Sequence, residues 1–197
     1  MTVVEIDRIE MADNSNELSL DAMFDMLEKL PVPEGVKVEI VGGNIFMSPQ
    51  RNVHWQIIRR IMHALEDKFG RESDILTDVR IDFPGTLNGF APDLAKFRDD
   101  AARDPKGPWL AADVEFIAEV ISKDTATNDY GPKKTAYATA EVPALLIVDP
   151  YTGRCHLHTD PKEGEYTSEL TVTFGHPIDL TQTPAGITLA TEDFPRD

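Results

Sequence analysis

Two almost wholly apolar runs, at residues 114–121 and 144–149, constrain the fold of this chain more than any other feature. Each has the length of a β-strand, and a run that is apolar on both faces is typical of a strand in the middle of a sheet. The helical pattern between them, at about residues 129–140, is long enough to connect two parallel strands. The pattern therefore predicts a strand–helix–strand unit with a right-handed crossover.

Amphipathic and alternating patterns surround this unit. The apolar residues of segment 20–30 form one helical stripe, with Ser19 as a capping residue. Gly42 and Gly43 suit the tight turn of a hairpin. A second amphipathic helix is expected from Asn52, and alternating strands are expected at residues 36–41, 44–47, 76–83, 154–159 and 165–174. We therefore predict an α/β domain with a mixed central β-sheet flanked by helices.

Length and composition predict one domain in a reducing compartment. The chain of 197 residues can bury a sizeable core, and we expect a single domain over residues 19–197, preceded by a loosely ordered tail at residues 1–18. The lone Cys155 excludes an internal disulfide framework and a cysteine-based zinc site, and we expect a buried structural thiol. Without a membrane-span pattern or a signal-peptide pattern, a cytoplasmic protein with no membrane partner is expected.

The net charge of −16 opposes binding to a polyanion over the surface as a whole. Two interpretations remain open. Either nucleic acid is not the substrate, or a local basic face and bound metal ions overcome the repulsion. The candidate basic residues are Arg51, Arg59, Arg60, Lys68, Lys123, Lys133 and Lys134.

Two acids lie at or inside apolar, strand-like segments. Asp93 follows Pro92, a residue suited to the start of a strand or to an edge strand. Glu119 has the same strand parity as Ile117 and Ile121, so its carboxylate is expected to face apolar residues. An unpaired charge there would cost several kcal/mol or shift its pKa strongly. A metal ion or a nearby cation would remove this cost, and a structural salt bridge is the alternative.

Lys133 completes the candidate chemistry. Asp129, Lys133 and Tyr137 are spaced four residues apart and share one helix face. This spacing fits a surface acid–base pair, but the helix also leaves the end of the Glu119 strand and can direct a lysine back toward it. Two carboxylates that hold a divalent cation and one ammonium are the minimum set for metal-assisted cleavage of a phosphodiester.

Other polar residues favour simpler roles. Glu39 has the opposite strand parity from its apolar neighbours and is expected to face solvent, and His54 is expected to be a helix cap or a packed side chain. His156 and His158 share a strand face and could bind metal, but no third ligand is evident, so we interpret them as structural or exposed. There is no glycine-rich phosphate loop and no nucleophile-elbow motif.

Four ordered motifs resemble the Uma-type putative restriction endonuclease family of the PD-(D/E)XK nuclease superfamily. The resemblance runs from about residue 20 to residue 174, and its motifs are segments 38–49 with His54 beyond it, 91–94, 119–122 and 129–137, followed by the strand at 142–150. It implies a restriction-endonuclease-like fold. Ile121 stands in the usual lysine position two residues after Glu119, and Lys133 rather than Lys134 fits the family spacing to Tyr137.

This resemblance assigns roles to the candidate residues. It implies that Asp93 and Glu119 bind Mg²⁺, with Mn²⁺ as a substitute, and that Lys133 is the catalytic lysine. Glu39 would be a further acid near the site and His54 a family position of unassigned role. DNA would be the substrate, and a homodimer would let two sites address two strands.

The leading hypothesis is therefore a metal-dependent endonuclease that hydrolyses DNA phosphodiester bonds. The acidic charge keeps two alternatives open. One is a catalytically silent nuclease-fold module with a binding or regulatory role, and the other is a metal-dependent hydrolase of another phosphate ester.

Overall fold

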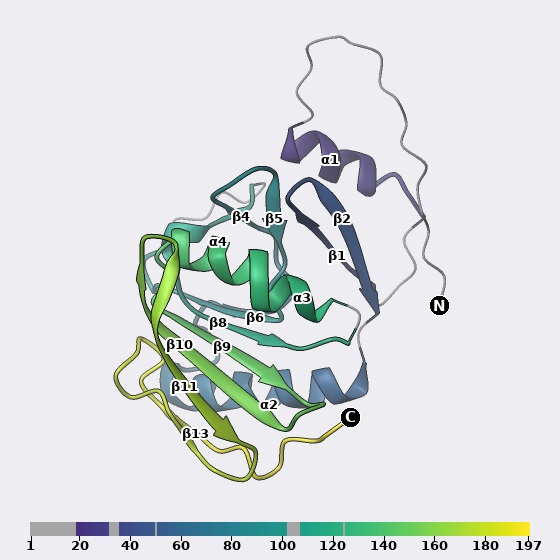
Figure 1. Ribbon diagram of the computed structural model, residues 1–197. Coiled ribbons are helices and arrows are strands. Elements are labelled where there is room, and N and C mark those ends of the chain that lie inside the picture. Colours follow the sequence, from purple (N-terminus) through teal and green to yellow (C-terminus); the bar gives the residue numbers. More distant parts are fainter. Residues whose placement is uncertain (1–18, 32–35, 50, 102–106, 124) are drawn as a thin grey trace.

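The computed structural model describes residues 19–31, 36–49, 51–101, 107–123 and 125–197 (Figure 1). The tail predicted at residues 1–18 lies outside the described residues. Strands and helices are interleaved along the chain, and the strands form two larger sheets and one small two-stranded sheet. The α/β class with a mixed central sheet is therefore confirmed. Among the described helices, none is long and apolar enough to cross a membrane.

The larger sheet contains the strand–helix–strand unit at its centre. Its strands lie in the order β11-β10-β9-β8-β6-β3. Strands β8 and β9 pair in parallel and all other neighbours in this sheet are antiparallel. The six strands are β3 (Ile75–Leu76), β6 (Leu94–Phe97), β8 (Val114–Val120), β9 (Ala144–Asp149), β10 (Arg154–Lys162) and β11 (Glu165–Thr173). The two apolar runs are the central strands, as their pattern predicts.

The second sheet has the order β2-β1-β5-β4-β7, and β4 and β7 are its parallel pair. Its strands are β1 (Val36–Val41), β2 (Asn44–Pro49), β4 (Ile81–Phe83), β5 (Asn88–Phe90) and β7 (Trp109–Leu110). A small third sheet pairs β12 (Ile178–Asp179) with β13 (Thr188–Leu189). A short 3₁₀ turn, η1 (Ala111–Asp113), precedes β8.

The single strand expected at residues 76–83 is wrong. The chain forms β3 in the first sheet, then β4 in the second, and it changes sheets between them. Asp78 has φ 54°, a left-handed conformation that interrupts a strand, and its N–H donates to the carbonyl of Pro92 at 3.1 Å. Because alternation continues through this point in the sequence, the break is invisible to a period-two pattern.

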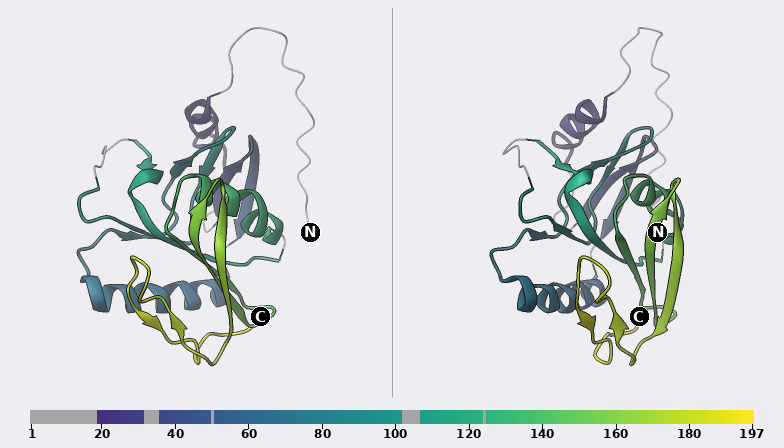
Figure 2. Two further views of the ribbon diagram at one scale, coloured as in Figure 1. Left: turned by 60° about the vertical axis from the view of Figure 1, so that its left-hand side comes forward. Right: turned by 90° about the vertical axis from the view of Figure 1, so that its left-hand side faces the viewer.

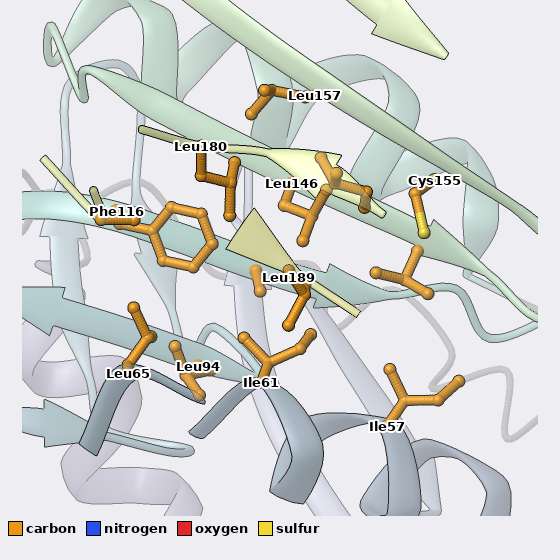
Figure 3. Packing of buried hydrophobic residues seen from close by; sticks show 14 of the residues in the cluster. Ile57, Ile61, Leu65, Leu94, Phe116, Leu146, Cys155, Leu157, Leu180 and Leu189 are labelled. Carbon is orange, nitrogen blue, oxygen red and sulfur yellow. The ribbon is translucent and has the colours of Figure 1, made fainter. Parts of the chain in front are cut away.

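Helix α2 (Asn52–Phe69) covers one face of the larger sheet, and Figure 2 shows it together with the C-terminal segment beside it. Its fully buried Ile57, Ile61 and Leu65 pack against Phe116 of β8 and Leu146 of β9 (Figure 3). Burying each such side chain stabilises the fold by about 1.5–3 kcal/mol. Since successive strand residues point to opposite faces, this packing directs the alternate residues of β8, including Glu119, to the other face.

Helix α1 (Leu20–Leu27) is shorter than the segment expected at 20–30, and Ser19 caps it by accepting from the N–H of Ala22 at 3.2 Å. Met23 and Leu27 of this helix pack on Ile40 of β1. The predicted buried thiol is also confirmed, because Cys155 is 1% exposed in the core of Figure 3 and burial raises its pKa to about 12.

The helix expected at residues 129–140 begins earlier, at Ala126, and the segment is divided into three parts. It consists of α3 (Ala126–Asn128), a kinked turn η2 (Asp129–Lys133) and α4 (Lys134–Thr139). The break falls at Gly131, with φ −116° and ψ −106°, directly before Pro132, whose ring and missing N–H disrupt a regular helix.

Candidate active site

Lys133 is buried at the junction of the two sheets and contacts three carboxylates. Its Nζ lies 2.8 Å from Glu119 Oε1, 2.9 Å from Glu39 Oε1 and 2.9 Å from Asp129 Oδ1. The lysine is 1% exposed. The interpretation as a surface acid–base pair is therefore wrong, because η2 faces the interior between the sheets rather than solvent. The helix directs Lys133 back at the Glu119 strand, as the order of the elements suggested.

Asp93 and Glu119 lie side by side because their strands are neighbours. Strands β6 and β8 pair with Leu94 opposite Ala118. The N–H of Asp93 donates to Glu119 Oε2 at 3.3 Å, and Asp93 Oδ2 accepts from the N–H of Val120 at 2.7 Å. Pro92 lies just before β6, so the missing backbone N–H of this proline does not remove a hydrogen bond between strands. The two acids that the sequence singles out are thus brought together.

Glu39 belongs to the same cluster, and its expected solvent-facing position is wrong. The side chain is 7% exposed, and its Oε1 accepts from the N–H of Ala91 at 3.0 Å as well as from Lys133. Strand β1 lies in the second sheet, and its polar face is turned toward the larger sheet. An alternating strand has one polar face whether solvent or a second layer lies over it, so parity cannot decide between the two.

Lys37 was missed by the sequence analysis. Its Nζ lies 2.7 Å from Asp93 Oδ1, 3.7 Å from Glu39 Oε2 and 4.0 Å from Glu119 Oε2. The available signal was its spacing, because Lys37 and Glu39 are two apart on one strand and must share a face. Because Glu39 lies at the site, Lys37 on the same face of β1 is expected there too.

The pKa values of the four acids split into two pairs. Burial raises the pKa of Glu119 to about 7, and Lys133 and Lys37 only partly offset this effect. Burial likewise raises the pKa of Asp129. Burial also opposes ionisation of Asp93, but the nearby ammonium of Lys37 holds its pKa below the usual range, and Lys133 does the same for Glu39. The hydroxyl of Tyr137 donates to Glu119 Oε1.

Both lysines stay protonated. Burial disfavours their charged forms, yet the surrounding carboxylates raise the pKa of Lys37 and of Lys133 above the usual lysine value. Four carboxylates therefore face two ammonium groups, and the cluster carries two negative charges in excess when every acid is ionised. The cluster borders a cavity of about 30 Å³, room for a water molecule.

The rim of this cavity includes residues at the start of α2. His54 is buried, and its Nε2–H donates to the carbonyl of Ile121 at 2.8 Å, so it is a packed side chain, one of the two roles expected for it. Trp55 beside it is 45% exposed. Ser48, Ser122 and Thr125 complete the polar lining.

The residues fit a hard divalent cation in donor type and in charge. Carboxylate oxygens are the ligands that Mg²⁺ and Mn²⁺ prefer, and the excess charge equals that of one such ion. As the side chains lie, however, no group of three or more His, Cys, Asp or Glu residues in the described part of the chain is arranged to hold a metal ion. Lysine ammonium groups lie against the carboxylates instead.

Two other groups of candidates lie elsewhere. His156 Nδ1 contacts Thr171 Oγ1 at 2.9 Å, and His158 is buried. Of the basic residues considered for a local positive surface, Lys133 is inside the site and Arg51 pairs with Asp197 at 3.3 Å.

The chain is similar to known proteins in sequence and in fold. A family model described as "Uma2: Putative restriction endonuclease" matches residues 24–192. A crystal structure of a putative nuclease from Anabaena variabilis has a similar fold, with a TM-score of 0.63 and 15% identity over 89% of this chain and 96% of that chain. No curated protein matches.

Proposed function

The chain belongs to the Uma2 putative restriction endonuclease family, and we propose from this membership and from the site that it is a Mg²⁺-dependent nuclease that hydrolyses DNA phosphodiester bonds. The observation that carries the proposal is the convergence of Asp93 and Glu119, from neighbouring strands, with the buried Lys133. These are the three groups that this hydrolysis needs.

In this function Asp93 and Glu119 bind Mg²⁺, and Mn²⁺ substitutes for it. A bound ion would polarise the phosphate and lower the pKa of the attacking water. Asp93 is suited to the role because the N–H of Val120 fixes its second oxygen. Glu119 carries a pKa of about 7 in the protein without metal, and a neighbouring cation favours its ionised form.

Lys133 acts as a fixed positive charge. Its pKa lies well above the usual lysine value, so at neutral pH it cannot accept a proton from water. It can donate a hydrogen bond to the attacking water or stabilise charge that develops on the phosphate. Glu39 and Asp129 hold the ammonium in place, and Glu39 is itself fixed by the N–H of Ala91. Glu39 is therefore a positioning residue.

The acidic surface limits how DNA can bind. With a net charge of −16, counterion release supplies little affinity. The exposed indole of Trp55 at the cavity offers another source, because a base stacked on an aromatic side chain contributes about 1–3 kcal/mol. We expect the active form to be a homodimer that addresses two strands, which light scattering of the purified protein would test.

The decisive experiment is cleavage of supercoiled plasmid and of single-stranded DNA in Mg²⁺ or Mn²⁺. We expect nicking by the wild type and loss of nicking in Asp93→Asn and Glu119→Gln, each checked for folding by circular dichroism. Asp67→Asn, an exposed acid on α2, is the matched control and should cut normally.

Cleavage that is equal in all four proteins would show a contaminating nuclease. Turnover of small phosphodiesters without DNA cleavage would favour the hydrolase of another phosphate ester. No turnover of any substrate, together with no metal binding by calorimetry, would favour the silent module.

A further inference from the structure

The ammonium of Lys37 lies against the carboxylates that the proposed function assigns to the metal. It contacts Asp93 at 2.7 Å and lies 4.0 Å from Glu119, and Glu39 is 3.7 Å away. A cation that touches one carboxylate oxygen and approaches two more occupies the kind of position that a divalent ion takes among acids.

The charge of Lys37 is too small to neutralise the carboxylates around this position. The lysine brings one positive charge to a cluster that, when all four acids are ionised, has two negative charges in excess even after both lysines are counted. Its approaches of 3.7 and 4.0 Å to Glu39 and Glu119 are longer than hydrogen bonds. A divalent ion in its place would satisfy the same oxygens at about 2.0–2.6 Å.

We propose that Lys37 is the resident cation of this site in the metal-free protein and that Mg²⁺ must displace its ammonium from Asp93 to bind. The inference rests on the proposed metal dependence. Lys37 is thus an autoinhibitory contact, since it lowers the affinity of the site for metal and keeps it closed at low metal concentration.

The two lysines differ in how firmly they are held, and this difference identifies the one that moves. Lys133 is 1% exposed and has three carboxylate partners within 2.9 Å. The Lys37 side chain is 10% exposed, has one close partner and lines the cavity. Its four-carbon stem is flexible, so its head can leave Asp93 without a change in the backbone of β1.

Calorimetric titration with Mn²⁺ tests the proposal without relying on activity. We expect Lys37→Met to bind Mn²⁺ with a dissociation constant about tenfold or more below that of the wild type, because one competing charge has been removed. Asp93→Asn should abolish binding in both backgrounds. Equal or weaker binding by Lys37→Met, with measurable binding by the wild type, would overturn the role of Lys37 and leave the proposed function standing. No binding by either protein would overturn both.

A measurement on the wild type covers the case in which Lys37→Met does not fold. Amine-reactive labelling followed by mass spectrometry reports the accessibility of each lysine with and without Mg²⁺. Labelling of Lys37 should rise several-fold on metal addition, while the exposed Lys29 stays reactive and Lys133 stays protected. Unchanged labelling of Lys37 at a Mg²⁺ concentration that saturates the site would overturn the proposal.

Discussion

Replacement of Lys133 by Met tests whether one buried ammonium organises the site. Lys133 has three carboxylate partners at 2.8–2.9 Å. At an effective dielectric constant of 20, one pair at this distance attracts by about 6 kcal/mol. The net cost of the substitution is smaller than this attraction, because Lys133→Met also removes the free energy needed to desolvate the buried ammonium. Breaking a buried pair by deleting one partner typically costs about 3–5 kcal/mol, and we expect a loss of this size at neutral pH.

The loss should depend on pH, because the acids can take up protons in place of the lysine. Glu119 and Asp129 have folded-state pKa values raised above their unfolded ones. A raised folded pKa adds stability below the unfolded value, and this contribution is lost as the pH rises through the folded pKa. Without Lys133 these pKa values rise further. The difference between wild type and variant should therefore be smallest near pH 5 and largest near pH 8.

Urea unfolding followed by circular dichroism at the two pH values measures this difference. Lys134→Met is the matched control, because this neighbouring lysine is half-buried and makes none of the ion pairs of Lys133; its cost should stay within about 0.5 kcal/mol. A loss for Lys133→Met below about 1 kcal/mol, or a loss that shrinks as the pH rises, would refute the reasoning.

Three further predictions concern single side chains. DNA added without metal should quench the fluorescence of exposed Trp55, while buried Trp109 stays unchanged. Burial first, and nearby positive charge second, lower the pKa of His158 to about 4 from 6.5. The unfolded chain then takes up the proton first, so acidification through this range should cost about 3 kcal/mol of unfolding free energy, a loss absent in His158→Gln. Tyr137→Phe, which removes a donor to buried Glu119, should cost about 1–3 kcal/mol in urea unfolding.

Each has a control. Trp55→Phe should abolish the quenching, and quenching that persists would place the bound DNA elsewhere. His176→Gln, at an exposed position, should retain the acid loss of the wild type. If Tyr137→Phe unfolds at the wild-type urea concentration, then the hydroxyl contributes nothing net to the buried carboxylate.

The sequence predicts those parts of the fold in which the hydrophobic pattern of a segment follows from its place within a single sheet. The runs that became β8 and β9 are apolar on both faces, and only a central strand needs that composition. Glu119 stood out in such a run because a charge there conflicts with its neighbours. The resemblance to the family connected Asp93 and Lys133 with Glu119 through the order of the motifs. The family is confirmed by the match of the family model to residues 24–192.

The parts that the sequence does not predict depend on how two layers meet. Lys37 and Glu39 lie on the polar face of β1, and only the position of the second sheet over the first turns that face inward. Asp78 joins the two sheets through a left-handed backbone that a non-glycine residue adopts rarely. Neither the packing of one sheet on another nor this local conformation leaves a periodic signal in the sequence.

The position of the site between two sheets also bears on how the chain folds. The bond from Lys133 to Glu39 joins residues 94 apart in sequence, and that from Lys37 to Asp93 joins residues 56 apart. Closure of such long loops follows the formation of local hairpins and helices. The charge cluster should thus form after the rate-limiting step, so its variants should unfold faster while refolding at nearly the wild-type rate. The cluster then governs the lifetime of the native state.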